Sequence, residues 1–157
     1  MRLPDIAIRV HGIPAPQGSK NSFPIYTGRG KNRQFTGRVA LQESSQKVGP
    51  WREAVREAAL LEAGPDWICL DGPLVAEFCF TFTRGRTVKR LHHTVYPDLS
   101  KIIRSTEDAL TTAHIWKDDA RVVAYHNPRK LYVGAPDPDA LPEPGVVIRI
   151  WALGEAQ

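Results

Sequence analysis

The sequence predicts an α+β fold, in which helices pack on one side of a mixed β-sheet. Short runs of alternating apolar residues indicate strands, and two longer runs with apolar residues at steps of three and four indicate amphipathic helices. At 157 residues the chain is large enough to enclose one apolar core. We therefore expect a single domain over residues 1–157, with a basic loop at 19–42 and a Pro-rich surface connection at 134–145.

The chain begins with a strand and a basic segment. Residues 6–10 alternate as in a strand that ends before Gly12. Residues 21–39 contain several glycines and basic side chains without sustained periodicity, so they predict a long loop or a loose hairpin. Aromatic residues in this segment could stack on exposed nucleic-acid bases or could attach the segment to the core. The sequence leaves both alternatives open for Phe23, Tyr26 and Phe35.

A helix and a central strand are predicted next. Ser44 or Ser45 is expected to cap a helix that ends at Gly64-Pro65. Residues 74–83 predict a strand with two alternating sets of side chains, and the set that is apolar throughout is assigned to the core. That set is Leu74, Ala76, Phe78, Phe80 and Phe82. Residues 84–90 then predict a basic turn, and residues 92–96 predict a short extended segment.

A second helix is predicted from residue 99 to about residue 113. Its apolar stripe consists of Leu99, Ile102, Ile103, Thr106, Leu110 and Ala113. Asp98 precedes the stripe, where a carboxylate can accept a hydrogen bond from a free backbone amide and suits the positive end of the helix dipole. The opposite, polar face is expected to carry Ser100, Arg104, Glu107 and Asp108.

After this helix the chain is predicted to turn and return as strands. Residues 116–119 form the turn, and residues 121–126 alternate as in a strand that Pro128 ends. Residues 133–145 are acidic and Pro-rich, which predicts an irregular surface connection. Residues 146–152 form the last predicted strand. The turn therefore delivers two adjacent carboxylates, Asp118 and Asp119, after the helix.

Basic residues are unevenly distributed. The net charge is +4 and the calculated pI is near 9.3, yet residues 6–42 and 78–97 contain no Asp or Glu at all. Either segment alone could be a solvated loop, but together they favour a surface that binds nucleic-acid phosphates. The predicted DNA contacts are Lys20, Arg29, Lys31, Arg33, Arg84, Arg86, Lys89, Arg90, Lys101 and Lys130.

The sequence argues against several other classes of protein. Cys69 and Cys79 lie in apolar surroundings without a CxxC pair, so we expect reduced core residues and no zinc site. No apolar run is long enough to span a bilayer, and the N-terminus lacks the apolar region of a signal peptide. We expect a cytoplasmic protein with no membrane partner.

Three aspartates are candidate metal ligands. Asp98, Asp118 and Asp119 supply the hard oxygen atoms that Mg²⁺ or Mn²⁺ prefers. A metal held there can polarise a phosphodiester and stabilise the leaving oxygen. Taken singly, Asp98 could equally be a helix N-cap, and Asp118 or Asp119 could equally be a turn residue.

Three linked motifs resemble one nuclease family. The motifs are PDLSK at 97–101, DALT at 108–111 and IWKDDARVV at 115–123. Their order and spacing resemble the signature of RusA-type Holliday-junction resolvases, in which D-x-D-N-x-x-x-K, D-A-L-T and W-x-D-D-x-x-V follow one another. The resemblance implies a small α+β homodimer, typically phage or prophage encoded. It also implies that the dimer binds four-way DNA junctions and nicks two opposing strands with Mg²⁺ during recombination and repair.

The resemblance also implies residue roles. Asp98 corresponds to the first catalytic aspartate of the family and Asp119 to the last, with Asp118 beside it. Arg104 is matched to the helical lysine near the phosphate, one residue before the position that the spacing D-x-D-N-x-x-x-K gives. Ser100 stands where the family has its second aspartate, and Lys101 stands where asparagine is usual.

Ser100 raises an alternative function. A hydroxyl is a poorer Mg²⁺ ligand than a carboxylate, so the alternative is a catalytically weakened or inactive junction-binding protein on the same scaffold. Glu107, two helical turns after Ser100, could replace the missing ligand or could be a solvated charge. Asp108 is expected to pair with Arg104.

Overall fold

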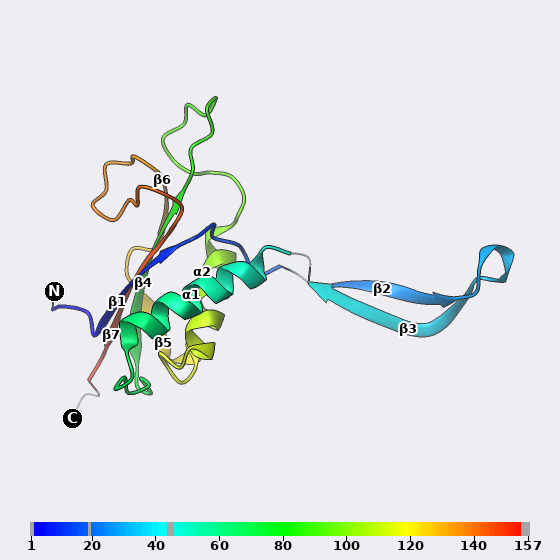
Figure 1. Ribbon diagram of the computed structural model, residues 1–157, viewed down its shortest axis with the longest axis horizontal. Coiled ribbons are helices and arrows are strands. Elements are labelled where there is room, and N and C mark those ends of the chain that lie inside the picture. The colour runs from blue at the N-terminus through cyan, green and yellow to red at the C-terminus, as the bar shows by residue number, and fades with distance from the viewer. Residues whose placement is uncertain (1, 19, 44–45, 155–157) are drawn as a thin grey trace.

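Strand β4 (Leu74–Phe82) is the centre of a mixed β-sheet in this computed structural model, which describes residues 2–18, 20–43 and 46–154. On one side β4 pairs antiparallel with β7 (Gly145–Ala152), which pairs antiparallel with β1 (Ile6–His11). On the other side β4 pairs parallel first with β5 (Val122–Tyr125) and then with β6 (Arg129–Tyr132). Figure 1 shows these strands forming one layer. The predicted α+β fold with a mixed sheet is confirmed.

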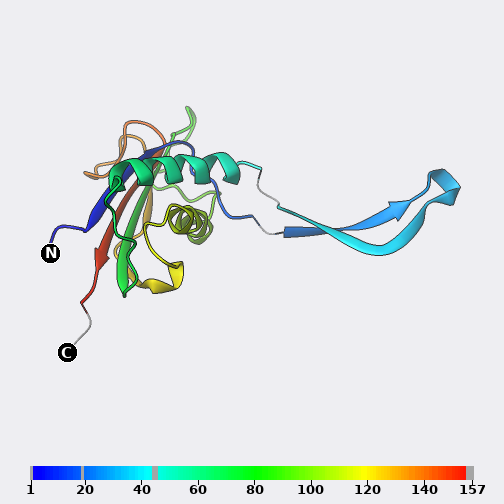
Figure 2. The same cartoon turned by 60° about the horizontal axis from the view of Figure 1, so that its bottom comes forward.

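Helices α1 (Val48–Ala63) and α2 (Leu99–Thr112) cover one face of this sheet. Figure 2, in which α2 is seen nearly end-on, shows them on the same side. A buried hydrogen bond joins the helices, because the Trp51 indole donates to the Thr106 hydroxyl at 3.1 Å. The predicted core set of β4 is buried beneath them, which confirms that assignment. None of the described helices has the length and apolar character needed to cross a bilayer.

The opposite face of β4 is also covered. Thr81 and Cys79 are fully buried there, and the Thr81 hydroxyl accepts a hydrogen bond from the Leu141 amide at 3.0 Å. Leu141 belongs to the Pro-rich connection, which therefore packs on the sheet as a cover. Neither cysteine is in a disulfide, and Cys79 is a core residue as predicted, whereas Cys69 is only half-buried.

A five-residue ion cluster fixes that connection to the sheet. The Glu77 carboxylate of β4 accepts from Arg149 at 2.8 Å and from Arg129 at 3.3 Å. Arg129 also binds Asp137 at 2.8 Å and Asp139 at 2.9 Å, and Arg149 binds Asp139 at 2.6 Å. The bonds from Arg149 and Arg129 hold the pKa of Asp139 below its ordinary value. The acidic residues of the connection are therefore counter-ions for two strand arginines.

Replacing Asp139 with alanine is expected to destabilise the fold by about 2–4 kcal/mol at pH 7, because Arg149 and Arg129 would each lose one of their acidic partners in a partly dry site. The ordinary pKa of an aspartate is near 3.9, and the folded value is lower, so this stabilisation is present above about pH 4 and is lost as the pH falls through the folded pKa. Urea unfolding of Asp139→Ala at several pH values, with the exposed Asp66→Ala as control, measures both effects. An equal stability of the two variants at pH 7 would contradict the assignment.

The basic segment is a β-hairpin that extends away from the sheet and helices (Figures 1 and 2). Strands β2 (Lys20–Thr27) and β3 (Gln34–Glu43) pair antiparallel, with the short 3₁₀ helix η1 (Gly30–Asn32) at the tip. We call this hairpin the arm. The pairing register shifts between Pro24 and Tyr26, which explains why the sequence lacks sustained alternation.

The aromatic residues of the arm do not attach it to the core. Tyr26 and Phe35 pack against each other with ring centroids 5.8 Å apart, and they remain 43% and 55% exposed. The Arg33 guanidinium lies 4.0 Å from the centre of the Tyr26 ring. The side chains of residues 20–23 and 40–43, including Phe23 and Lys20, lie outside the described part of the structure. Among the described aromatics, attachment to the core was therefore the wrong alternative.

Some predicted boundaries differ from the structure. The first described residue of α1 is Val48, with Lys47 at the N-cap position, while Ser44 and Ser45 lie outside the described residues. Residues 92–96 form bends and no strand. Strand β6 was not predicted, because Pro128 suggested an end and the four residues that follow do not alternate. Its pairing with the second half of β4 supplies the missing constraint.

Candidate active site

Asp98 lies at the N-cap position of α2, but its side chain does not cap the helix. The backbone carbonyl of Asp98 accepts the first helical bonds, from the Lys101 and Ile102 amides at 3.1 Å each. The carboxylate makes no capping hydrogen bond and is exposed to solvent. The predicted capping bond is therefore wrong, since backbone bonds alone begin the helix. The carboxylate stays accessible to a ligand.

Buried residues after α2 position the adjacent aspartates Asp118 and Asp119. Ile115 and Trp116 are fully buried. Backbone hydrogen bonds hold this segment to Leu70: the Leu70 amide donates to the Ile115 carbonyl at 3.1 Å, and the Leu70 carbonyl accepts from the Lys117 amide at 2.8 Å. The Trp116 indole also donates to the Thr111 hydroxyl at 2.8 Å. The segment immediately before Asp118 is thus held to Leu70 on one side and to Thr111 of α2 on the other.

Asp118 and Asp119 open the 3₁₀ turn η2 (Asp119–Arg121) in different environments. The Asp118 carboxylate accepts from the Ala120 amide at 2.7 Å, which lowers its pKa and confirms a turn-capping role. Burial raises the pKa of Asp119, and its hydrogen bond with Asp118 and that residue's charge add to the effect. Adjacent carboxylates therefore differ in their proton affinity, which favours a shared proton or a cation between them.

Glu107 is buried, so the predicted solvated position on the polar face is wrong. Glu107 is only 6% exposed, and its carboxylate accepts a hydrogen bond of 2.7 Å from the Tyr125 hydroxyl of β5. Burial raises the pKa of Glu107 to about 7, opposed by this hydrogen bond and reinforced by the charges of Asp119 and Asp108. The helix turns this face toward β5, which the helical period alone does not reveal.

Asp108 pairs with the neighbouring helix. Its carboxylate accepts from the Arg52 guanidinium of α1 at 3.2 Å, so the predicted pair with Arg104 is wrong. The packing of α1 against α2 places Arg52 beside Asp108. Arg104 is exposed, as are Ser100 and Lys101.

Glu107, Asp108, Asp118 and Asp119 form what we call the carboxylate cluster. Asp108 and Asp119 line a shallow depression of about 380 Å³ beside the C-terminal half of α2. Its lining residues are Arg52, Asp108, Thr111, Thr112, Asp118 and Asp119. Within the carboxylate cluster, Asp108 has Arg52 as its partner, while Glu107 and Asp119 have raised pKa values. The depression therefore combines negative charge with little cationic compensation.

The structure does not bring all four predicted metal ligands together in one chain. Glu107 lies nine positions after Asp98, a rise of about 14 Å along the helix. Within the described residues, no three His, Cys, Asp or Glu side chains are close enough to one another to hold a metal ion. Glu107, Asp118 and Asp119 lie in one region, and Asp98 lies near the other end of α2.

Changing Glu107 to glutamine is expected to remove a pH-dependent loss of stability. The folded pKa near 7 exceeds the ordinary glutamate value of about 4.5, so the native state binds more protons between these values and the free energy of unfolding falls as the pH rises. The fall is roughly 3 kcal/mol between pH 5 and pH 8. Urea unfolding in metal-free buffer should show this slope in the wild type and a flatter profile in Glu107→Gln. The exposed Glu57→Gln should keep the wild-type slope, and an unchanged slope in Glu107→Gln would argue against the buried carboxyl.

Most predicted DNA contacts whose side chains are described are exposed, whereas Arg84 and Lys130 are half-buried. Arg29, Lys31 and Arg33 are exposed around the tip of the arm, and Arg86 and Lys89 are exposed in the loop between β4 and α2. Three further predicted contacts also bond to the protein. In the loop, Arg84 donates to the carbonyls of Val88 and Arg90, and Arg90 donates to the Tyr132 hydroxyl. On β6, Lys130 donates to the carbonyls of Val95 and Pro97.

Sequence reasoning missed Tyr125 and Arg52. Tyr125 was predicted only as a strand residue, and Arg52 only as part of an amphipathic packing helix. Each contacts the carboxylate cluster from a different element, through pairing of β5 with β4 and packing of α1 on α2. No local spacing links them to Glu107 or Asp108.

Comparison with known families supports a nuclease. The family model described as Endodeoxyribonuclease RusA matches residues 23–150, which include most of the arm, both acid-bearing ends of α2 and the final strand. A search of curated proteins gives no match. The matched region covers more than half of the chain.

Proposed function

Because this chain belongs to the RusA endodeoxyribonuclease family, we propose that it resolves four-way DNA junctions by metal-dependent hydrolysis of phosphodiester bonds. The family comprises Holliday-junction resolving endonucleases that bind branched DNA and generally depend on a divalent metal. The observation that carries the proposal for this chain is the carboxylate cluster, which lies at the end of the helix that Asp98 begins.

The chemistry of these donors suits a hard divalent cation, although no three of the described acids lie close enough together to hold one as they stand. Glu107 and Asp119 are carboxylates with raised pKa values in a region where Arg52 already pairs with Asp108. A bound cation relieves this repulsion, and oxygen ligands are those that Mg²⁺ and Mn²⁺ prefer. When bound, the metal supplies a Lewis acid that polarises the phosphodiester and stabilises the leaving oxygen. We propose Asp118, Asp119 and Glu107 as its ligands, with Glu107 in place of the aspartate that Ser100 replaces. The fourth predicted ligand, Asp98, lies about 14 Å from Glu107 along α2 and does not meet the other three within one chain.

Residues of the chain itself orient the DNA. Arg104 is exposed on α2 between Asp98 and the carboxylate cluster, where its permanent charge can hold the scissile phosphate and oppose the charge that develops on it. Lys101, one turn from Asp98, can contact the same strand. Arg104 does not act as a base, because a guanidinium does not release its proton at neutral pH.

We propose that the arm and the loop between β4 and α2 hold the DNA branches of the junction. B-DNA's major groove admits a two-stranded β-ribbon, and ten residues of β3 span about 33 Å. A homodimer would present two such arms and two sites to the two opposing strands of a four-way junction. A two-fold symmetric pair matches that substrate.

A junction-binding protein without strong nuclease activity is the second candidate. Ser100 offers only a hydroxyl in the first turn of α2, and the distance between Asp98 and Glu107 along the helix separates the remaining acids. This alternative keeps the same DNA surface and loses only the hydrolysis step.

Cleavage of a synthetic four-way junction distinguishes the candidates. With Mg²⁺ or Mn²⁺, the enzyme hypothesis expects wild-type nicking and at least a 100-fold loss in Asp119→Asn, because a neutral amide removes a metal ligand of similar shape. The exposed Asp66→Asn should cleave normally. Junction binding without nicking, with nicking gained in Ser100→Asp, would establish the alternative. Equal affinity for the junction and a linear duplex would contradict both.

Removing Arg29 and Arg33 together should weaken junction binding and its dependence on salt. Each phosphate contact contributes about 0.9 to the slope of log affinity against log salt, so the double alanine variant should lower that slope by about 2. A matched variant, with Arg9 and Arg56 replaced by alanine, changes the net charge equally away from the arm. The same slope in both double variants would exclude a role of the arm tip in phosphate binding.

A further inference from the structure

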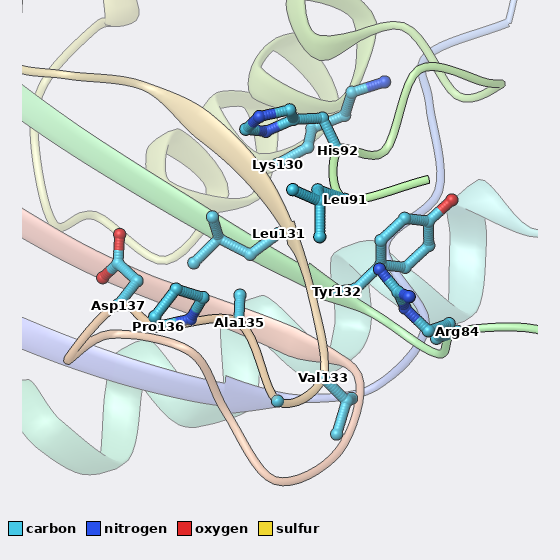
Figure 3. A pocket seen from close by; sticks show the side chains of 11 residues that line it. Arg84, Leu91, His92, Lys130, Leu131, Tyr132, Val133, Ala135, Pro136 and Asp137 are labelled. Carbon is cyan, nitrogen blue, oxygen red and sulfur yellow. The ribbon is translucent and has the colours of Figure 1, made fainter. Parts of the chain in front are cut away.

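A cavity lies between the β4–α2 loop and the end of β6, outside the carboxylate cluster (Figure 3). It has a volume of about 520 Å³. Leu91 and His92 from the loop lie across from Ala135, Pro136 and Asp137 in the turn that follows β6. This size is in the range of small-molecule sites, which combine apolar walls with a few polar groups.

The lining joins apolar walls to a cationic rim. Leu91, Leu131, Val133, Ala135 and Pro136 contribute apolar surface. Arg84 and His92, from the acid-free segment 78–97, and Lys130 of β6 add nitrogen donors to the lining. Asp137 is the one acid in the lining, and it is paired with Arg129. A flat apolar group that carries an anionic phosphate matches this combination better than a purely apolar ligand does.

One wall is held in place without a ligand. The Arg84 guanidinium lies 4.9 Å from the centre of the Tyr132 ring and donates to the carbonyls of Val88 and Arg90. Arg90 in turn donates to the Tyr132 hydroxyl at 3.0 Å. Tyr132 is 3% exposed, so the aromatic wall is fixed by packing and by these bonds. A ligand that enters the cavity therefore does not have to immobilise the side chains of Arg84 and Tyr132.

The cavity is connected to the start of α2 through Lys130. The Lys130 ammonium donates to the carbonyl of Val95 at 3.0 Å and to that of Pro97, the residue before Asp98, at 2.9 Å. The side chain of Lys130 therefore lines the cavity while its charged end lies beside the segment that positions Asp98.

We propose that this cavity receives one unstacked nucleobase of the DNA strand whose phosphate lies at Asp98. The inference rests on the proposed junction binding and adds a base subsite to it. Bases next to a branch point are the least costly to unstack, and an extruded base is held by stacking and apolar contact. The apolar walls contact its base, and the excess of cationic over acidic side chains in the lining favours its phosphate.

The occupied subsite has a measurable effect on affinity. The base would be held by contact with the apolar walls, because Tyr132 is buried and offers no free ring face. Holding one base contributes about 1–3 kcal/mol, which corresponds to a change of roughly 5- to 150-fold in the dissociation constant. Removing the correct base from the DNA, or filling the cavity from the protein side, should each remove this contribution. Doing both should cost little more than doing one, since the two changes delete the same contact.

The experiment measures binding of four-way junctions that carry one abasic residue, scanned through the positions on each side of the branch point. Fluorescence anisotropy without divalent metal prevents cleavage. For wild type, one position should weaken binding at least 5-fold. Ala135→Phe, which places a ring in the cavity, should weaken binding of the intact junction similarly and should be insensitive to that abasic position. The exposed Leu91→Ala, which removes part of the wall without touching the core, should reduce the same sensitivity.

The control is Leu61→Phe, which adds an aromatic ring to an exposed site on α1 and should behave as wild type. Tight wild-type binding of the junction with no sensitive abasic position would overturn the base subsite alone. An abasic position that weakens Ala135→Phe as much as wild type would also overturn it. Loss of a dimer in Ala135→Phe, measured by sedimentation, would assign the cavity to a protein interface. Failure of wild type to prefer the junction over duplex would overturn the subsite together with the proposed function.

Discussion

Burial of β4 on both faces is the constraint on which the rest of the structure depends. One face supplies Phe78 and Phe80 to the core beneath α1 and α2, and this packing fixes the helix that begins at Asp98. The other face places Glu77 under the Pro-rich connection, where Arg129 and Arg149 join it to Asp137 and Asp139. The same strand therefore organises the apolar core and the charged cover. Loss of either face would release elements that carry the candidate site.

The carboxylate cluster is a consequence of that packing and works against stability. Pairing of β5 with β4 brings the Tyr125 hydroxyl to Glu107, while the turn after α2 brings Asp119 near the same carboxylate. Burial and mutual repulsion raise the pKa values of Glu107 and Asp119. Sites that perform chemistry commonly hold such unfavourable charges, because a substrate or cation relieves them on binding. In this chain the proposed function gives the unfavourable arrangement a reason.

The DNA surface that we propose consists of two parts with different contacts to the rest of the protein. The arm presents exposed cations and aromatic rings far from the core, whereas the cavity beside β6 has a wall fixed by Arg84, Arg90 and Tyr132. A protruding ribbon suits contacts with phosphates that tolerate variation in DNA shape. A preorganised cavity suits recognition of one group at a defined distance from Asp98. The two would thus contribute to affinity and to positioning, respectively.

The sequence by itself determined the fold class, the core face of β4, both ends of α2 and the family motifs, because each depends on local periodicity or spacing. It also identified Asp98, Asp118 and Asp119 as acids at the two ends of one helix. Only the tertiary structure decided that Glu107 is buried against Tyr125, that Asp108 pairs with Arg52, and that residues 129–132 form a strand. These features depend on contacts between elements far apart in the chain. Local spacing predicts which face of a helix a residue occupies, but packing decides what that face meets.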